Sequence, residues 1–296
     1  MAGTVPTSAN EFIEQQLNER LSMLEQAFDS DVLTIVGPLV DGMDDFIRTL
    51  IEDLRQRDAQ RPHLAVVLTT NGGYIETVQR IVDTLRHHYD HVSFVIPNYA
   101  FSAGTVLAMS GDDVFMDYYS RLGPIDPQAR NARGRSVPAL GYLKQWERLL
   151  EKANDGTLSI AEAQLMIEGF DQAELYQYEQ ARELSIALLK EWLVKYKFKN
   201  WTTTETRNVP VTPEMRQNRA ETIARELNNT DRWHSHGYGI SMDVLRKDLN
   251  LRIDDLGRDP ERHEKVRQYD GLLSDYMPKF GHQSVLHTVR KYQPIA

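Results

Sequence analysis

Along the first half of the chain, short runs of apolar residues alternate with longer stretches in which apolar residues recur every three or four positions. The short runs are rich in β-branched and aromatic residues and indicate buried strands at 31–36, 64–69, 92–96 and 114–116. The helical spacing indicates helices at 43–54, 75–85 and 102–109. Strands that alternate with helices of this length predict an α/β fold with right-handed βαβ crossovers and a largely parallel sheet.

The segments on either side of these strands are predicted to be mainly helical. Ser8 and Glu11 form a capping box that begins a helix with one apolar stripe. Residues 129–138 are polar, basic and interrupted by Gly and Pro, so they predict an exposed loop or a lid over the site. Helical spacing then continues over 140–198, and a Thr-Pro pair begins another helix at 213–227.

The last part of the chain predicts two more helices and one strand. Ser241 is expected to cap a short helix, followed by a strand at 251–253. A charged helix is predicted at 260–279, and the tail up to Ala296 is expected to be peripheral. The predicted organisation begins with an N-terminal helix (1–30) and an α/β core (31–128). A loop with a helical insertion follows (129–228), then a late segment that belongs to the core (229–257) and a C-terminal helix with its tail (258–296).

Charge and composition argue against several classes of protein. The chain has 34 Lys and Arg residues and 43 Asp and Glu residues, a net charge of −9, whereas nucleic-acid binding favours a basic surface. The absence of cysteine excludes disulfides and a thiolate nucleophile, and it fits a reducing cytoplasm. No signal peptide is visible. Residues 92–111 carry no charge, but Pro97, Asn98 and Gly104 within them fit a strand, a turn and a helix better than a membrane span.

Ser102 lies where a predicted strand gives way to a predicted helix. Pro97-Asn98 ends the strand, and the small residues Ser102, Ala103 and Gly104 open the helix. At a helix N-terminus the unpaired N–H groups and the positive end of the helix dipole favour a developing negative charge. Ser102 is therefore a candidate nucleophile, although a serine at this position is equally typical of a helix N-cap.

A second strand-to-helix turn could supply backbone N–H groups to bind the negative charge that forms when a serine attacks a carbonyl. Thr70-Asn71-Gly72-Gly73 separates the strand at 64–69 from the helix at 75–85. Paired glycines allow the backbone to approach a ligand closely and to direct N–H groups at an oxyanion. The carboxyl ends of neighbouring parallel strands share one edge of a sheet. The glycine turn and the Ser102 turn together therefore predict an acyl-transfer site.

Three separated segments carry a resemblance to a known family: TTNGGYIETVQRIVDTL, VIPNYAFSAGTVLAMSGDDVFMD and YSRLGPIDPQ. In this order and spacing they resemble the Clp-fold serine proteases, most closely the serine dehydrogenase proteinase family, which is related to signal peptide peptidase A and ClpP. The resemblance covers about 32–128, and the family usually has Pro at the position of Asn71. It implies a ClpP/crotonase-like fold and a serine peptidase. Ser102 would form the acyl-enzyme, and N–H groups of Gly72, Gly73 and Ala103 would form the oxyanion hole.

The resemblance also implies partners. It implies a peptide or protein substrate and no cofactor, and it leaves room for an activating partner protein. The N-terminal helix and the long helical insertion have more apolar surface than one core of this type uses, so a homo-oligomer is expected.

The general base stays open between two residues. In ClpP a His follows the strand after the nucleophile helix, but the matching segment here, 122–126, contains none. His236 lies where ClpP-like folds place the third member of the triad and is slightly favoured; its alternative is a structural histidine. Lys144 lies roughly where signal peptide peptidase-type enzymes supply a Lys base, and its apolar neighbours would desolvate it; its alternative is a solvated helix lysine.

The remaining polar residues near these candidates have lesser expected roles. His234 is a third candidate base, and Asp126 or Asp231 would orient the base. His234 and His236 would point to one face of a strand, but without a third strong ligand at a defined spacing no metal site is predicted.

Two other functions remain open. A crotonase-like acyl-CoA enzyme uses the same pair of oxyanion-binding N–H groups without a serine nucleophile; Ser102 followed by the LGPIDPQ segment favours the peptidase. The missing ClpP-type His instead favours a catalytically inactive scaffold of the same fold.

Overall fold

The structure is a computed structural model that describes residues 6–57, 61–125, 128–130, 136–204 and 207–295. The strands are β1 (Asp31–Val36), β2 (His63–Thr69), β3 (His91–Val95), β4 (Tyr99–Ala100), β5 (Asp113–Met116), β6 (Arg121–Leu122), β7 (Gln128–Arg130), β8 (Ser136–Pro138), β9 (Ile240–Ser241), β10 (Asp254–Asp255), β11 (Ser284–Thr288) and β12 (Lys291–Ile295). The α-helices are α1 (Ala9–Phe28), α2 (Met43–Leu54), α3 (Ile75–His88), α4 (Ala103–Met109), α5 (Ala139–Asn154), α6 (Ile160–Gly169), α7 (Gln172–Trp192), α8 (Pro213–Leu227), α9 (Thr230–Trp233), α10 (Met242–Lys247) and α11 (Pro260–Lys279).

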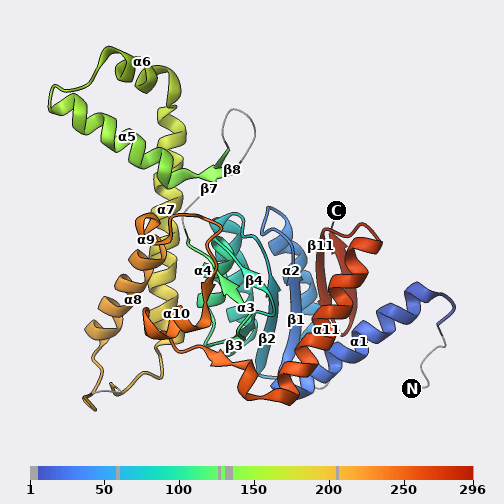
Figure 1. Ribbon diagram of the computed structural model, residues 1–296. Coiled ribbons are helices and arrows are strands. Elements are labelled where there is room, and N and C mark those ends of the chain that lie inside the picture. The colour runs from blue at the N-terminus through green and yellow to red at the C-terminus, as the bar shows by residue number, and fades with distance from the viewer. Residues whose placement is uncertain (1–5, 58–60, 126–127, 131–135, 205–206, 296) are drawn as a thin grey trace.

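A seven-stranded sheet in the order β10-β5-β3-β2-β1-β11-β12 forms the centre of the molecule (Figure 1). The five strands from β10 to β1 are parallel neighbours, and β11 and β12 are antiparallel. The prediction of an α/β fold with a largely parallel sheet is confirmed. Because β2 and β3 are adjacent and parallel, the turns that follow them leave the same edge of the sheet.

Helices cover both faces of this sheet (Figure 1). Successive side chains of a strand point to opposite faces. Leu33 and Ile35 of β1 accordingly pack in the cluster that includes α2, α3 and α4, whereas Val32 packs in the cluster that includes α1 and α11. The apolar stripe of α1, which was expected to exceed what the core uses, is thus largely buried against it, with Leu17, Leu21 and Leu24 fully buried.

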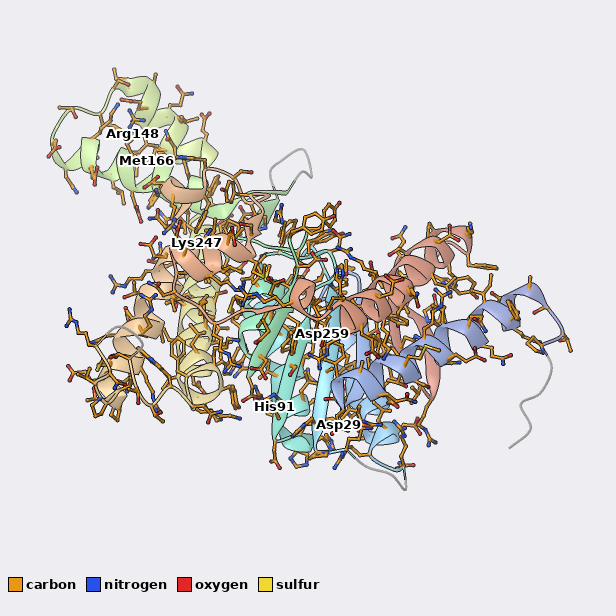
Figure 2. All side chains as sticks on the ribbon, turned by 60° about the horizontal axis from the view of Figure 1, so that its bottom comes forward. Asp29, His91, Arg148, Met166, Lys247 and Asp259 are labelled. Atoms are coloured by element: carbon orange, nitrogen blue, oxygen red, sulfur yellow. The ribbon has the colours of Figure 1, made fainter. Side chains whose placement is uncertain are left out.

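A helical arm formed by α5, α6 and the first part of α7 projects away from the sheet (Figure 1). Its outer end, marked by Arg148 and Met166, stands apart from the core in Figure 2. The second part of α7 continues as a π-helix, Leu193–Lys197, and packs against α3, α4 and α8. The prediction of helical structure over 140–198 is confirmed, except for the short connections between the helices.

Three predictions about the later chain need correction. The tail is not peripheral, because all five residues of β11 are buried and β11 pairs with β1; the polar Ser284, His287 and Thr288 concealed this strand in the sequence. No strand forms at the expected residues 251–253, where Leu251 and Ile253 are buried in the core. The strand begins directly after them, as β10, which pairs with β5. The described parts of 129–138 include the β7–β8 hairpin rather than a plain loop, and 131–135 lie outside the described residues.

A buried hydrogen-bonded chain fastens the tail to the rest of the molecule. The hydroxyl of Tyr269 lies 2.7 Å from Thr34 Oγ1 and 2.8 Å from His287 Nδ1, and His287 Nε2 lies 2.9 Å from Asn18 Oδ1. With Nε2–H donating to Asn18 and Nδ1 accepting from Tyr269, the neutral imidazole satisfies both partners. Burial lowers the pKa of His287 to about 3.

This histidine predicts a fall of stability in acid. In the unfolded chain the imidazole has its ordinary pKa of 6.5 and takes up a proton below that pH. In the folded chain its pKa is about 3, so it stays neutral down to about pH 3. Folded-state stability is therefore present above pH 6.5 and is lost as the pH falls, by about 1.4 kcal/mol per pH unit from this group. Between pH 7 and pH 4, urea unfolding should show that the free energy of unfolding falls less in His287→Gln than in the wild type. Parallel losses would contradict the assignment.

Candidate active site

The glycine turn and the Ser102 turn lie against one another. The Thr70 N–H donates to the carbonyl of Tyr99 at 3.1 Å, and the Phe101 N–H donates to the carbonyl of Thr70 at 2.9 Å. These bonds join the end of β2 to β4 and to Phe101, the residue before Ser102. The two turns approach so closely that a Cβ atom placed on Gly72 would lie 2.7 Å from Ser102 Cβ. The structure therefore brings together the two turns that the sequence singled out.

Ser102 has an unusual backbone for a residue with a side chain. It lies at the N-cap position of α4 with φ 54° and ψ −125°, and its side chain makes no capping hydrogen bond. Such a conformation costs about 1–3 kcal/mol and is concentrated at functional sites. Only 8% of the residue is exposed. Ser102 therefore does not act as an ordinary N-cap, which was the structural alternative to a nucleophile.

Two backbone amides beside Ser102 have no backbone acceptor within the described residues. Leu39 pairs with the glycine turn through the Gly72 carbonyl and the Tyr74 N–H, each at 2.8 Å, and the Gly73 N–H lies between these two bonds. Ala103 is the first residue of α4, where N–H groups have no partner within the helix. Within the described part of the chain, neither the Gly73 nor the Ala103 N–H donates a backbone hydrogen bond.

Both glycines are required by the shape of the turn. Gly72 has φ 100°, in the left-handed region, and its N–H donates to Thr70 Oγ1 at 3.0 Å. A Cβ atom on Gly73 would lie 2.0 Å from the carbonyl oxygen of Leu39. Of the two glycines predicted as oxyanion donors, Gly72 thus uses its N–H within the turn, whereas the Gly73 N–H donates no backbone hydrogen bond among the described residues.

The loop that contains His236 is attached to the Ser102 side of the molecule. It leads into β9, which pairs with β6, and β6 pairs with β4. Trp233 anchors its beginning, since the indole Nε1–H donates to the Glu226 carbonyl at 2.7 Å. His236 is partly buried, whereas His234 is exposed.

Lys144 has a different environment from the one expected. Its side chain is 47% exposed, and Nζ lies 2.5 Å from Asp231 Oδ1. The expected burial among apolar neighbours is wrong, because nearly half of the side chain is exposed, whereas Leu143 is buried against Leu175. Asp231, which was expected to orient a base, binds Lys144. Asp126, the other expected carboxylate, lies outside the described residues.

Sequence reasoning missed two threonines that shape the site. Thr70 accepts the Gly72 N–H, an interaction that the Thr-Asn-Gly order could have suggested as a side-chain turn. Thr105 bonds to the backbone of Gly123, 18 positions away, which no local pattern could indicate. In the described residues no group of three or more His, Asp or Glu side chains is arranged to hold a metal ion. None of the described helices is long and apolar enough to cross a membrane.

A family model described as ClpP-like SDH-type serine proteinase matches residues 43–200, more than half of the chain. The chain belongs to this family. The matched region contains the glycine turn, the Ser102 turn and the helical arm. The family expected from the three sequence motifs is thus confirmed.

Two curated relatives match a smaller part of the chain. The uncharacterized protein MJ1495 of Methanocaldococcus jannaschii is 30% identical over 114 residues, which cover 38% of this chain and 37% of the relative. The uncharacterized protein MJ0137 of the same organism is 28% identical over 158 residues, 50% of this chain and 52% of the relative. The chain therefore spans about half, or less, of the length of these relatives.

Solved structures of proteases are also similar to this chain. A Lys-to-Ala variant of the 1510-N membrane-bound stomatin-specific protease in complex with a substrate peptide is 15% identical, with a TM-score of 0.44 and coverage of 75% of this chain and 73% of its own. A Ser-to-Ala variant of that protease is 14% identical, with a TM-score of 0.45 and coverage of 78% and 82%. ClpP1 from Listeria monocytogenes is 11% identical, with a TM-score of 0.40 and coverage of 82% and 95%.

The backbone strain at Ser102 predicts that a glycine there stabilises the protein. Ser102→Gly should raise the free energy of unfolding by about 1 kcal/mol, because relief of 1–3 kcal/mol of strain exceeds the 0.5–1 kcal/mol entropic cost of glycine. Ser102→Ala retains the Cβ atom and hence the strain, so it should change stability little. Chemical denaturation of the three proteins measures the difference. A glycine variant no more stable than the alanine variant would show that the backbone is relaxed.

Proposed function

We propose that this SDH-type proteinase hydrolyses peptide bonds through an acyl-enzyme on Ser102. The proposal is carried by one observation: a strained serine with an unbonded hydroxyl lies beside two amides, of Gly73 and Ala103, that have no backbone partner in the described chain. Ser102 Oγ attacks the peptide carbonyl, and these two N–H groups hold the oxyanion. The C–N bond then breaks, the amine leaves with a proton from the base, and water releases the acyl group.

His236 is our first choice for the base. Its loop precedes β9, which belongs to the same small sheet as β4, the strand that leads to Ser102. Lys144 is the second choice, because its side chain is half exposed and its Nζ lies 2.5 Å from Asp231 Oδ1. Lys144 would have to leave Asp231 before it could reach Ser102.

The nucleophile is tested with a fluorophosphonate probe and a fluorescent protein substrate. The wild type should be labelled, and Ser102→Ala should lose labelling and lose hydrolysis by a factor on the order of 10³ or more, because the bond-forming atom is gone. Circular dichroism should show an unchanged fold. Persistent hydrolysis in the alanine variant would remove Ser102 from the mechanism, whereas an unlabelled wild type would favour the inactive scaffold.

The same labelling rate separates the two bases. His236→Ala should slow labelling by about 10²-fold or more, and His234→Ala is its matched control in the same loop. Lys144→Ala and Asp231→Asn should stay near the wild-type rate. The reverse pattern would make the enzyme a Ser-Lys dyad protease.

We also propose that the protein is a homo-oligomer that associates through the helical arm. No described residue of α6 is buried, and Ile160 and Ile167 are 89% and 81% exposed. The arm stands away from the core, so a second copy can reach this surface (Figure 2). Exposed apolar patches of this kind mark association sites.

Mass measurement tests the oligomer. Light scattering at micromolar concentration should give a multiple of 34.1 kDa, and Ile167→Lys should shift the mass toward one chain, because a charge in an apolar interface is unfavourable. Thr49→Lys, at an exposed position of α2 outside the arm, is the control for added charge. A wild-type mass of one chain would refute the proposal.

A further inference from the structure

Thr105 makes an unusual set of hydrogen bonds for a residue inside a helix. It lies one turn into α4 and is fully buried. Its Oγ1 is 2.8 Å from the Ala100 carbonyl and 2.9 Å from the Gly123 carbonyl, and it accepts the Gly123 N–H at 2.9 Å. One hydroxyl thus connects three chain segments: the end of β4, the start of α4 and the loop after β6.

These contacts hold the chain both before and after Ser102. Ala100 lies two residues before Ser102, and the Thr105 N–H donates to the Ser102 carbonyl at 2.9 Å. Gly123 is pressed against the intervening residue, since a Cβ atom on Gly123 would lie 2.7 Å from Phe101 Cδ1 and 3.2 Å from Phe101 Cα. A strained conformation persists only where its surroundings over-determine it.

We infer that Thr105 is a positioning residue that holds the strained backbone of Ser102 by fixing Ala100 and Gly123. The catalytic part of this inference rests on the proposed peptidase, but the coupling between Thr105 and Ser102 does not. Valine has nearly the shape of threonine and lacks the hydroxyl, so it leaves the buried polar atoms of Gly123 without this partner. Serine keeps the hydroxyl and loses only a methyl group.

The first readout is the rate at which a fluorophosphonate probe labels Ser102. Thr105→Val should slow labelling by about tenfold or more, because a small displacement of a reacting atom is costly, and Thr105→Ser should recover most of the rate. The matched control is Thr34→Val, since Thr34 is also fully buried and hydrogen-bonded, to Tyr269. Thr34→Val should lower stability and leave the labelling rate unchanged.

The second readout is a double-mutant cycle on unfolding that combines Thr105→Val with Ser102→Gly. Loss of the Thr105 hydroxyl lets Ser102 relax, and this relief offsets part of the lost hydrogen bonding. A glycine at position 102 has no strain to relieve. The factor by which Thr105→Val raises the unfolding constant should therefore be at least about threefold larger in the Ser102→Gly protein than in the wild type. The cycle needs no enzymatic activity.

The outcomes separate this inference from the proposed function. An unlabelled wild type with a coupled cycle would refute the peptidase and support the role of Thr105 in holding Ser102. A labelled wild type with additive effects in the cycle, and with Thr105→Val labelled at the wild-type rate, would overturn the inference and leave the peptidase standing. Failure of Thr105→Ser to recover the rate would show that the methyl group, not the hydroxyl, matters.

Discussion

The site depends on two backbone hydrogen bonds between the end of β2 and the segment that follows β3. Through these bonds the N–H and the carbonyl of Thr70 pair with Tyr99 and Phe101, as in a parallel sheet. They carry the strand pairing past the ends of the long strands and press Gly72 against Ser102. Without them the glycine turn and the serine turn would be two separate loops.

The strain at Ser102 follows from the same arrangement. The segment from Tyr99 to Phe101 is held by Thr70 on one side and by Gly123 on the other, and α4 begins at the next residue but one. Ser102 must connect these fixed parts, and φ 54° is the result. Small residues pack tightly beside it, since a Cβ on Gly104 would lie 2.3 Å from Thr70 Cγ2. Strain and packing therefore have one cause.

The sequence predicted features that depend on neighbours in the chain and missed those that depend on distant ones. Helices such as α2, α8 and α11 were predicted at their observed bounds because their caps and apolar spacing are local. The turn at Gly72-Gly73 and the position of Ser102 were also local. β11 pairs with β1 across about 250 residues, and the side chain of its buried His287 is satisfied by Tyr269 of α11 and Asn18 of α1. The ion pair of Lys144 with Asp231 joins positions 87 apart, so its effect on the choice of base was invisible.

The departure of this chain from the motif of its family is consistent with how the turn is held. The family usually has Pro where this chain has Asn71, and Pro lacks a backbone N–H. In the structure the turn is held by hydrogen bonds of the residues around Asn71. The Gly72 N–H donates to Thr70 Oγ1, and Leu39 pairs with the Gly72 carbonyl and the Tyr74 N–H. The Asn71 N–H donates none of the backbone hydrogen bonds of the described chain, and the residue is exposed. The shape of the turn is thus set by the glycines and their partners, and the Asn71 N–H contributes none of the backbone hydrogen bonds that hold it.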